Sequence, residues 1–473
     1  MDFELTAAEQ AVWRAFPRRA LVDLTSAEDR VVRASVIRAL LLGAMPPEAG
    51  QLAALTLVGA EISGTLDLSY AEIPYAVRLS RCTFGERVEL VGARTRELDL
   101  AGSQLRGLWA EKASIEGNLR LAGVRSVGSI RLVAARIDGA LVLDGAQIAG
   151  APAVEGGLLS VGHDIRGPRL RCEGEVQLNS ADIRGSVRLH GATITNPDGR
   201  AMAAVGMVVG GTLSCCDGFS AQGRINISFA RVDKQVCFEH ARLHATTGVG
   251  LNCRQLQTTE LVLATGEPIE RPVDLRHARI GVLRDDEPLG WPTTLRLDGF
   301  SYDTIVSTAD VRQRLGWLDR DDDGYAPQAY EQLAAMYRRR GEEDSARTVL
   351  LRGQRRRRAL QSRPIQLWGY LQDVTVGYGY RPALAAMWLL ALFLVGTLAF
   401  TTQQPVPLDP ASPLHFRAPV YTLDLLLPLV DLHQETAFEP VGTTVWLAYG
   451  LIACGWILVT TIAAGTTRVL RRG

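Results

Sequence analysis

The amino-acid sequence predicts a mainly β protein: a β-solenoid with an N-terminal helical cap, a helical connector and two C-terminal transmembrane helices. Two observations predict this class. An apolar pattern recurs every 10 or 11 residues, and a fixed short period indicates a stacked repeat. Two long runs near the C-terminus carry no charge, as membrane-spanning helices do. The predicted domains are the cap at 1–50, the solenoid at 51–305, the connector at 306–381 and the membrane domain at 382–473, with an outer connector at 401–440.

The charges of the chain balance, with 51 Lys and Arg against 51 Asp and Glu. This balance gives no support for a chain-wide nucleic-acid surface or an acidic mimic of DNA, so we expect no nucleic-acid partner. No two of the seven cysteines have CxxC spacing, so the sequence contains no zinc-ribbon or thioredoxin-like motif. Their odd number and scattered positions are typical of a protein in a reducing compartment. No signal-peptide pattern opens the chain.

Residues 5–43 predict two helices that cover the first coil of the repeat. Thr6 with Glu9, and Thr25 with Glu28, have the spacing of capping boxes. The end coil of a stacked repeat exposes unpaired backbone groups and apolar side chains that promote aggregation. Terminal caps are therefore required for solubility. We therefore favour a structural cap over the alternative, a helix that binds a partner.

The repeat has the form apolar-x-Leu-x-x-Ala-x-Ile, as in Leu66, Leu68, Ala71 and Ile73. Apolar residues two apart face one side of a strand, and a unit of this length leaves no room for a helix. Each coil is therefore all-β, and coils must stack to bury their apolar sides. The pattern is interrupted at 149–175, returns at Val176 and ends near Phe300.

This pattern resembles the pentapeptide-repeat family and related right-handed parallel β-solenoids. The family's unit, Ala-Asp/Asn-Leu-x-x, survives in traces such as Ala181-Asp182-Ile183. The resemblance covers roughly residues 52–300 and implies a solenoid with a quadrilateral cross-section. Some members of the family mimic DNA through acidic surfaces, a role that the balanced charge here does not support.

The segment 308–361 predicts helices, and its pattern resembles one tetratricopeptide-type pair that connects solenoid and membrane. Within it, Asp319, Asp321 and Asp323 precede Gly324 with the spacing that opens a calcium-binding loop. The twelfth position, where a bidentate Glu is expected, holds Tyr330. Two alternatives follow: a calcium site at these three carboxylates, or an acidic turn that caps the next helix.

Residues 383–400 and 441–467 are the predicted spans. Eighteen residues at a rise of about 1.5 Å extend about 27 Å, close to the hydrocarbon thickness. A buried soluble helix is the alternative for each. Arginines flank the spans on their outer ends, whereas 401–440 is acidic, so the positive-inside rule predicts a two-span protein of the cell membrane with both termini cytoplasmic.

Four consecutive arginines precede the first span: Arg355, Arg356, Arg357 and Arg358. Near a bilayer such a run attracts anionic lipid headgroups, at about 1 kcal/mol per charge. The alternative is a topology signal with no specific ligand. We predict both roles together, in preference to a nucleic-acid site.

The membrane domain also resembles pentapeptide-repeat proteins with an ion-channel-like C-terminus, a resemblance that covers about residues 325–473. It rests on the turn Val376-Gly377-Tyr378-Gly379 that enters a two-span domain. With Thr375 this string spells a potassium filter, but it precedes the first span and therefore predicts a turn. Between the spans, residues 420–431 are apolar but too short to cross, which predicts a re-entrant or an interfacial segment.

A re-entrant segment must be covered by protein or water and so requires a homo-oligomer, in which Asp424 or Asp431 would form a carboxylate ring that favours cations. The predicted function is therefore an oligomeric, channel-like membrane protein whose solenoid is a sensor or a docking surface for a protein partner. The alternative is a non-conducting membrane scaffold for protein partners.

Catalytic motifs are absent from the sequence, and we predict no catalytic residue and no cofactor. Cys237, His240 and Cys253 are a weak candidate for a zinc or redox cluster. Proteins that resemble this chain sometimes carry the label of membrane-associated oxidoreductase, which is a third and weaker alternative. No flavin, haem or nicotinamide motif supports it.

Overall fold

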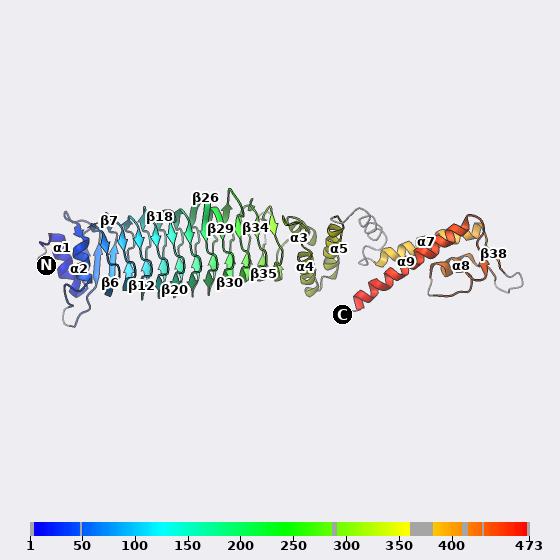
Figure 1. The fold of residues 1–473 in the computed structure, drawn as a ribbon, viewed down its shortest axis with the longest axis horizontal. Helices are drawn as coiled ribbons and strands as arrows, with labels where there is room; N and C mark the ends of the chain where they lie inside the picture. Colours follow the sequence, from blue (N-terminus) through cyan, green and yellow to red (C-terminus); the bar gives the residue numbers. More distant parts are fainter. Residues whose placement is uncertain are drawn as a thin grey trace. The chain divides into compact units, whose positions relative to one another are not determined.

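The computed structural model describes residues 4–47, 50–285, 291–359, 382–408, 415–427 and 430–470. The chain divides into two compact units, Met1–Met336 and Tyr337–Gly473. The first unit holds a long parallel β-solenoid with helices at both ends, and the second holds helices (Figure 1). Each unit is described by itself.

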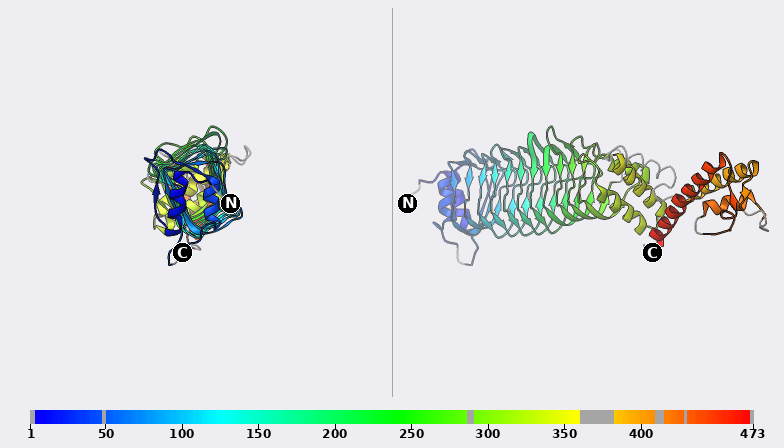
Figure 2. Two further views of the ribbon diagram at one scale, coloured as in Figure 1. Left: turned by 90° about the vertical axis from the view of Figure 1, so that its left-hand side faces the viewer. Right: turned by 45° about the vertical axis from the view of Figure 1, so that its right-hand side comes forward.

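The solenoid consists of two parallel sheets, with 18 and 19 strands in the described part of the chain. Each sheet is bent into two columns of short strands. In one column β12 (Ser114–Ile115) pairs with β16 (Arg136–Ile137), and in the next β13 (Leu119–Arg120) pairs with β17 (Leu141–Val142). A coil therefore crosses four columns, and the end view is a square (Figure 2). The predicted parallel β-solenoid is confirmed, with about 11 coils among the described residues.

The core lies inside the square and is built from stacked aliphatic side chains. Leu98, Leu119, Leu141 and Ile165 are register partners on successive coils, and all four are buried. Each fully buried leucine or isoleucine contributes about 1.5–3 kcal/mol through removal of apolar surface from water. The period-two alternation of the sequence therefore becomes four interior columns of apolar side chains.

The predicted interruption at 149–175 is wrong, because strands continue through it: β19 (Val154–Glu155), β20 (Ser160–Val161), β21 (Ile165–Arg166) and β22 (Arg171–Glu173). Ile130 pairs with Val154 across this coil, two residues further apart in sequence than Leu119 and Leu141. The inserted residues lengthen a turn without changing the stacking. They also lengthen the spacing between equivalent residues, so the repeat cannot be recognised from a fixed period in the sequence.

The N-terminal segment adds an outer layer to both sheets. α1 (Ala7–Ala15) begins with the predicted capping box of Thr6 and Glu9. β1 (Val22–Asp23) pairs with β3 (Leu55–Val58), and β2 (Val31–Arg33) pairs with β4 (Glu61–Ser63). The second predicted capping box, at Thr25, is wrong: α2 (Ala34–Leu41) starts after β2. Pairing of 31–33 with the open sheet edge takes precedence over a local helix start.

Glu9 links α1 to β2 within this cap. Its side chain is fully buried and receives hydrogen bonds from Arg33: Nε and Nη2 donate at 2.7 and 2.6 Å, and the backbone N–H donates at 3.0 Å. Burial by itself raises the pKa of Glu9, but the hydrogen bonds from Arg33 and Thr6 outweigh it and hold the pKa below its ordinary value.

The C-terminal end of the solenoid is closed by β36 (Leu295–Arg296), β37 (Ser301–Val306), α3 (Val311–Leu318) and α4 (Pro327–Arg339). Arg314 of α3 pairs with Asp285 through two hydrogen bonds of 2.6 and 2.7 Å, and both side chains are almost fully buried. The guanidinium of Arg314 lies 4.7 Å from the ring of Trp291 and 5.3 Å from that of Trp317. This buried ion pair holds α3 against the end of the solenoid.

The second unit contains α5 (Glu343–Ala359), α7 (Pro382–Thr402), α8 (Ala418–Leu426), α9 (Thr444–Leu470) and a pair of antiparallel strands, β38 (Val406–Pro407) and β39 (Phe438–Glu439). The predicted helices after residue 308 are present as α3, α4 and α5. α8 packs between α7 and α9 through a cluster that includes Phe400, Tyr421, Leu425 and Leu451. Both runs that were predicted as spans are helical, as α7 and α9.

Two glycines allow this close packing. A Cβ on Gly396 of α7 would lie 2.5 Å from Cγ2 of Thr422. A Cβ on Gly455 of α9 would lie 2.4 Å from the carbonyl oxygen of Leu426. Only glycine lets α8 approach both helices so closely.

Among the residues that the structure describes, no helix combines the length and the apolar character needed to cross a membrane.

We expect Asp285→Asn to loosen the C-terminal end of the solenoid, because it leaves the buried guanidinium of Arg314 without its counter-charge. Breaking such a pair costs about 3–5 kcal/mol. Hydrogen exchange of the β36 and β37 amides should accelerate by at least about 100-fold (about 1.4 kcal/mol per factor of ten). Asp138→Asn is the control, because Asp138 pairs with Arg136 at 2.8 Å on the exposed surface. Equal effects of the two substitutions would contradict the role of the buried ion pair.

We expect Glu9→Gln to weaken the N-terminal cap at neutral pH by about 1–3 kcal/mol, since Gln replaces an acceptor of charged hydrogen bonds. Because the folded-state pKa of Glu9 lies below the unfolded value of 4.5, its contribution is full above pH 4.5 and is lost as the pH falls through the folded-state pKa. Hydrogen exchange of β3 and β4 in both proteins checks this. The difference should shrink on acidification, and a difference that grows would refute it.

Candidate functional site

One cluster of metal-ligating side chains stands out on the solenoid wall: His190, Cys216 and Asp217. β25 (Val187–Arg188) pairs in register with β28 (Leu213–Ser214), and each strand runs into a corner of its coil. The backbone N–H of Gly191 donates to the carbonyl of Cys216 at 3.3 Å. The stacking of two coils therefore sets His190 beside Cys216.

The three side chains converge on one point. Sγ of Cys216 lies 3.1 Å from Nδ1 of His190 and 3.6 Å from Oδ2 of Asp217, and Nδ1 lies 3.4 Å from Oδ2. Cys216 is only 6% exposed, whereas the side chains of His190 and Asp217 are 40% and 67% exposed. The cluster thus has a covered sulfur and a face open to solvent.

Cys216 is backed by a small apolar cluster with Cys237, Val262 and Ala264 from the following coils. Burial, with added contributions from Cys237 and Asp217, raises the pKa of Cys216 to about 12. A cysteine with so high a pKa is a poor nucleophile at neutral pH. Thiol, imidazole and carboxylate are the ligand types that zinc takes in proteins.

The predicted combination of Cys237, His240 and Cys253 is not the one that the structure forms. Cys237 ends β30 (Arg231–Cys237) in one sheet, whereas Cys253 follows β32 (Leu251–Asn252) in the other and is fully buried. His190 and Cys216 were missed because they lie 26 residues apart, on coils longer than the repeat suggests. An alignment that allowed insertions at the turns could have paired them.

The predicted calcium loop forms the edge of the solenoid. Leu295 of β36 donates its N–H to the carbonyl of Arg320 at 2.9 Å, and the N–H of Asp322 donates to the carbonyl of Leu295 at 2.8 Å. The acidic run thus adds a short parallel bridge to the last coil. This backbone pairing covers an otherwise open strand edge.

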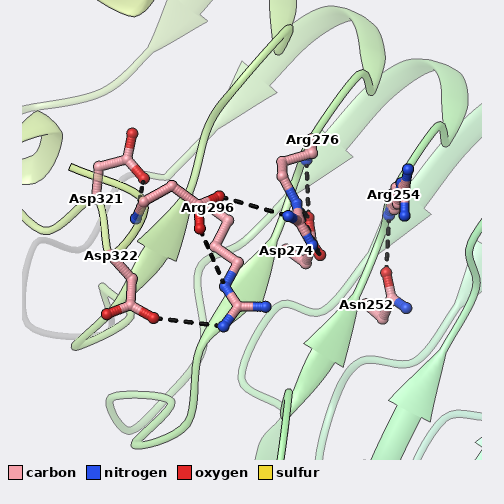
Figure 3. A network of polar contacts seen from close by, with 8 residues as sticks. Asn252, Arg254, Asp274, Arg276, Arg296, Asp321 and Asp322 are labelled. Atoms are coloured by element: carbon pink, nitrogen blue, oxygen red, sulfur yellow. Dashed lines mark hydrogen bonds and ion pairs between the residues drawn. The ribbon is translucent and has the colours of Figure 1, made fainter. Parts of the chain in front are cut away.

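Arginines of the solenoid wall pair with Asp322 and Asp323 of this loop, and Figure 3 shows Arg296 beside Asp322. Arg296 lies 3.4 Å from Asp322, and Arg276 lies 3.6 Å from Asp323 and 2.6 Å from Asp274. The N–H of Asp323 donates to Asp321, and the hydroxyl of Tyr330, at the twelfth position, donates to Asp319 at 3.2 Å. The calcium site at Asp319, Asp321 and Asp323 stays a prediction, as does the alternative of an acidic turn that caps the next helix.

Asp424, a predicted pore residue, is 5% exposed and fastens the loop that follows α8. Its carboxylate accepts hydrogen bonds from the N–H groups of Leu432, Gln434 and Glu435 at 2.7, 2.8 and 2.8 Å. Asp431, the other pore candidate, is exposed and lies 3.1 Å from Nδ1 of His433. Whether either lines a pore stays a prediction.

The basic run lies on α5. Arg355 and Arg357 are exposed and Arg356 is partly buried, while the side chain of Arg358 lies outside the described residues. The turn 375–379 also lies outside them. Binding of anionic headgroups by these arginines stays a prediction.

No family model, no curated protein and no solved structure matches this chain. The likeness to the pentapeptide-repeat family therefore rests on the residues quoted above and on the four-column solenoid.

We expect Asp424→Ala to release the segment 432–435, because three backbone N–H groups lose a charged acceptor worth about 1.5–3 kcal/mol per hydrogen bond. Hydrogen exchange of these amides in the full chain checks this. Asp431→Ala is the matched control, since its exposed carboxylate accepts only the N–H of His433 among the hydrogen bonds described here. Unchanged protection in Asp424→Ala would show that Asp424 does not fasten the loop.

Proposed function

We propose that the chain is a membrane-tethered scaffold, in which the α7–α8–α9 unit lies in a lipid bilayer and the solenoid is a docking platform for partner proteins. The observation that carries the proposal is the exposed apolar surface of α7. Leu390, Leu394 and Leu398 are spaced four apart on one helix face and are 58%, 59% and 69% exposed. Soluble monomers rarely leave contiguous apolar patches of this kind uncovered.

Lipid suits this surface better than a second copy of the chain does. Trp388 and Val395 are also exposed and lie to one side of the leucine stripe, so the apolar surface of α7 extends beyond one stripe. A helix that is apolar on all sides is typical of a buried or membrane environment, whereas a protein partner would need one face. At the start of α9, Trp446 and Tyr449 are exposed and pack edge to face at 6.3 Å. Aromatic side chains of this kind favour the headgroup region.

The flanking charges support an orientation. Arginines precede α7 on α5 and follow residue 467, while the connector between α7 and α9 is acidic. The positive-inside rule then puts the solenoid and both termini in the cytoplasm. Arg355, Arg356 and Arg357 would meet the anionic headgroups of that leaflet.

The scaffold is favoured over the channel because of Asp424. A cation pore needs Asp424 or Asp431 in a water-lined path, and the buried carboxylate of Asp424 already accepts three backbone hydrogen bonds. The oligomeric channel stays a prediction that the native mass of the detergent-purified chain tests. The oxidoreductase alternative also stays a prediction, which an absorbance scan for a bound chromophore tests.

The solenoid wall supports docking of proteins. Arg131 pairs with Glu111 at 2.9 Å and with Glu155 at 3.0 Å, and it shares the ring of Trp109 with Arg87. Charges of both signs therefore lie side by side on this part of the wall. Such a surface favours partners with complementary mixed charge over a polyanion.

We expect the triple variant Leu390→Glu, Leu394→Glu and Leu398→Glu to lose membrane retention. An acidic or basic residue at the centre of a spanning helix costs about 2.5–3.5 kcal/mol. Wild-type chain should stay in the membrane pellet after alkaline carbonate extraction, and the variant should be released or degraded.

Val127→Glu is the matched control, because Val127 is 66% exposed on the solenoid. It should leave retention unchanged. Wild-type protein that carbonate releases would overturn the proposal, as would a detergent-free soluble oligomer that the triple variant splits into monomers. The latter result would assign the leucine stripe to a second copy of the chain.

A further inference from the structure

We propose that His190, Cys216 and Asp217 bind a divalent transition-metal ion of the Zn²⁺ class on the wall of the solenoid. This inference is independent of the proposed membrane anchor, because the three residues lie on adjacent coils of the first unit. The three ligand atoms would be Nδ1 of His190, Sγ of Cys216 and Oδ2 of Asp217.

The distances between these atoms fit one tetrahedral ion. Zinc–ligand bonds of about 2.0–2.3 Å at tetrahedral angles require about 3.6 Å between N and S, about 3.4 Å between N and O, and about 3.6 Å between S and O. The corresponding distances here are 3.1, 3.4 and 3.6 Å. Two of the three distances already match, and the sulfur and nitrogen need to separate by only about 0.5 Å to reach the third.

The ligand types select the class of ion. Ca²⁺ and Mg²⁺ prefer sites made only of oxygen, whereas a thiolate with an imidazole favours Zn²⁺ or Co²⁺. On binding, the Sγ–metal bond forms as the S–H proton leaves to solvent. Because the side chains of His190 and Asp217 are 40% and 67% exposed, the fourth position faces water and the ion can enter from solvent.

The site is held by the fold. Backbone hydrogen bonds between the corners fix the separation of the coils: the N–H of Gly191 donates to the carbonyl of Cys216, and the N–H of Asp217 donates to the carbonyl of Glu239 on the following coil. Two ligands are adjacent residues of one corner, and the third comes from the preceding coil. A bound ion would therefore cross-link successive coils and slow their local opening.

Cys237 supplies a matched control. It is as buried as Cys216, at 6% exposed, and belongs to the same apolar cluster, yet it is not one of the three converging ligands. His277 supplies a second control, because it is a histidine of a later coil that lies outside the cluster.

The test is calorimetric titration of the detergent-purified full chain, stripped by a chelator, with Zn²⁺ alone. Wild-type protein should bind one ion at this site. Cys216→Ser, His190→Gln and Asp217→Asn should each weaken binding at least about tenfold, because loss of even an outer-shell partner of a ligand costs about 10–100-fold. Cys237→Ser and His277→Gln should bind as wild type does. Circular dichroism of each variant checks that the solenoid is folded.

Titration with Co²⁺ is the second measurement. A thiolate-to-cobalt charge-transfer band should appear in the wild type and in Cys237→Ser, and should be absent from Cys216→Ser. Failure of the wild type to bind Zn²⁺ at micromolar concentration would overturn the proposal. So would binding that survives Cys216→Ser and His190→Gln in folded protein, or a band that depends on Cys237 instead of Cys216.

Discussion

No coil of this protein can bury its own apolar side chains. Leu119, for example, is covered because Leu98 lies on the coil before it and Leu141 on the coil after it. The interior is therefore a set of aliphatic columns that gain stability only by stacking. Parallel hydrogen bonds between successive coils fix the register, so every feature of the first unit depends on this stacking.

Stacking leaves two open ends, and the chain closes them differently. At the N-terminus, β1 and β2 extend both sheets, and the buried Glu9 holds α1 to Arg33. At the C-terminus, the acidic run pairs its backbone with β36, and the buried pair of Asp285 and Arg314 holds α3. At both ends the backbone of a terminal segment forms hydrogen bonds with the exposed edge strand. A buried ion pair then holds the neighbouring helix in place. In the second unit a buried carboxylate has a related role, because Asp424 accepts hydrogen bonds from three backbone N–H groups of the loop after α8.

Stacking also brings together residues that no local pattern connects. Each position on one coil lies beside the equivalent position on the next coil. Polar side chains from successive coils can therefore form clusters on the outer surface of the solenoid. The Arg–Trp–Arg stack around Trp109 and the cluster of His190, Cys216 and Asp217 both arise in this way. A solenoid can thus carry a functional site on its wall without any change to its core.

The sequence by itself determined the β-solenoid, the Thr6 capping box and the helices at 308–361, because alternation, capping and helical periodicity are local signals. Only the tertiary structure decided three other features. The coil through 149–175 was hidden by two inserted residues, and the acidic run became a strand edge because Leu295 offered unpaired backbone groups. The metal-ligating cluster joins residues 26 apart, so its partners depend on the lengths of the turns between them. Contacts of this kind are set by the register of stacked coils, which a local pattern does not contain.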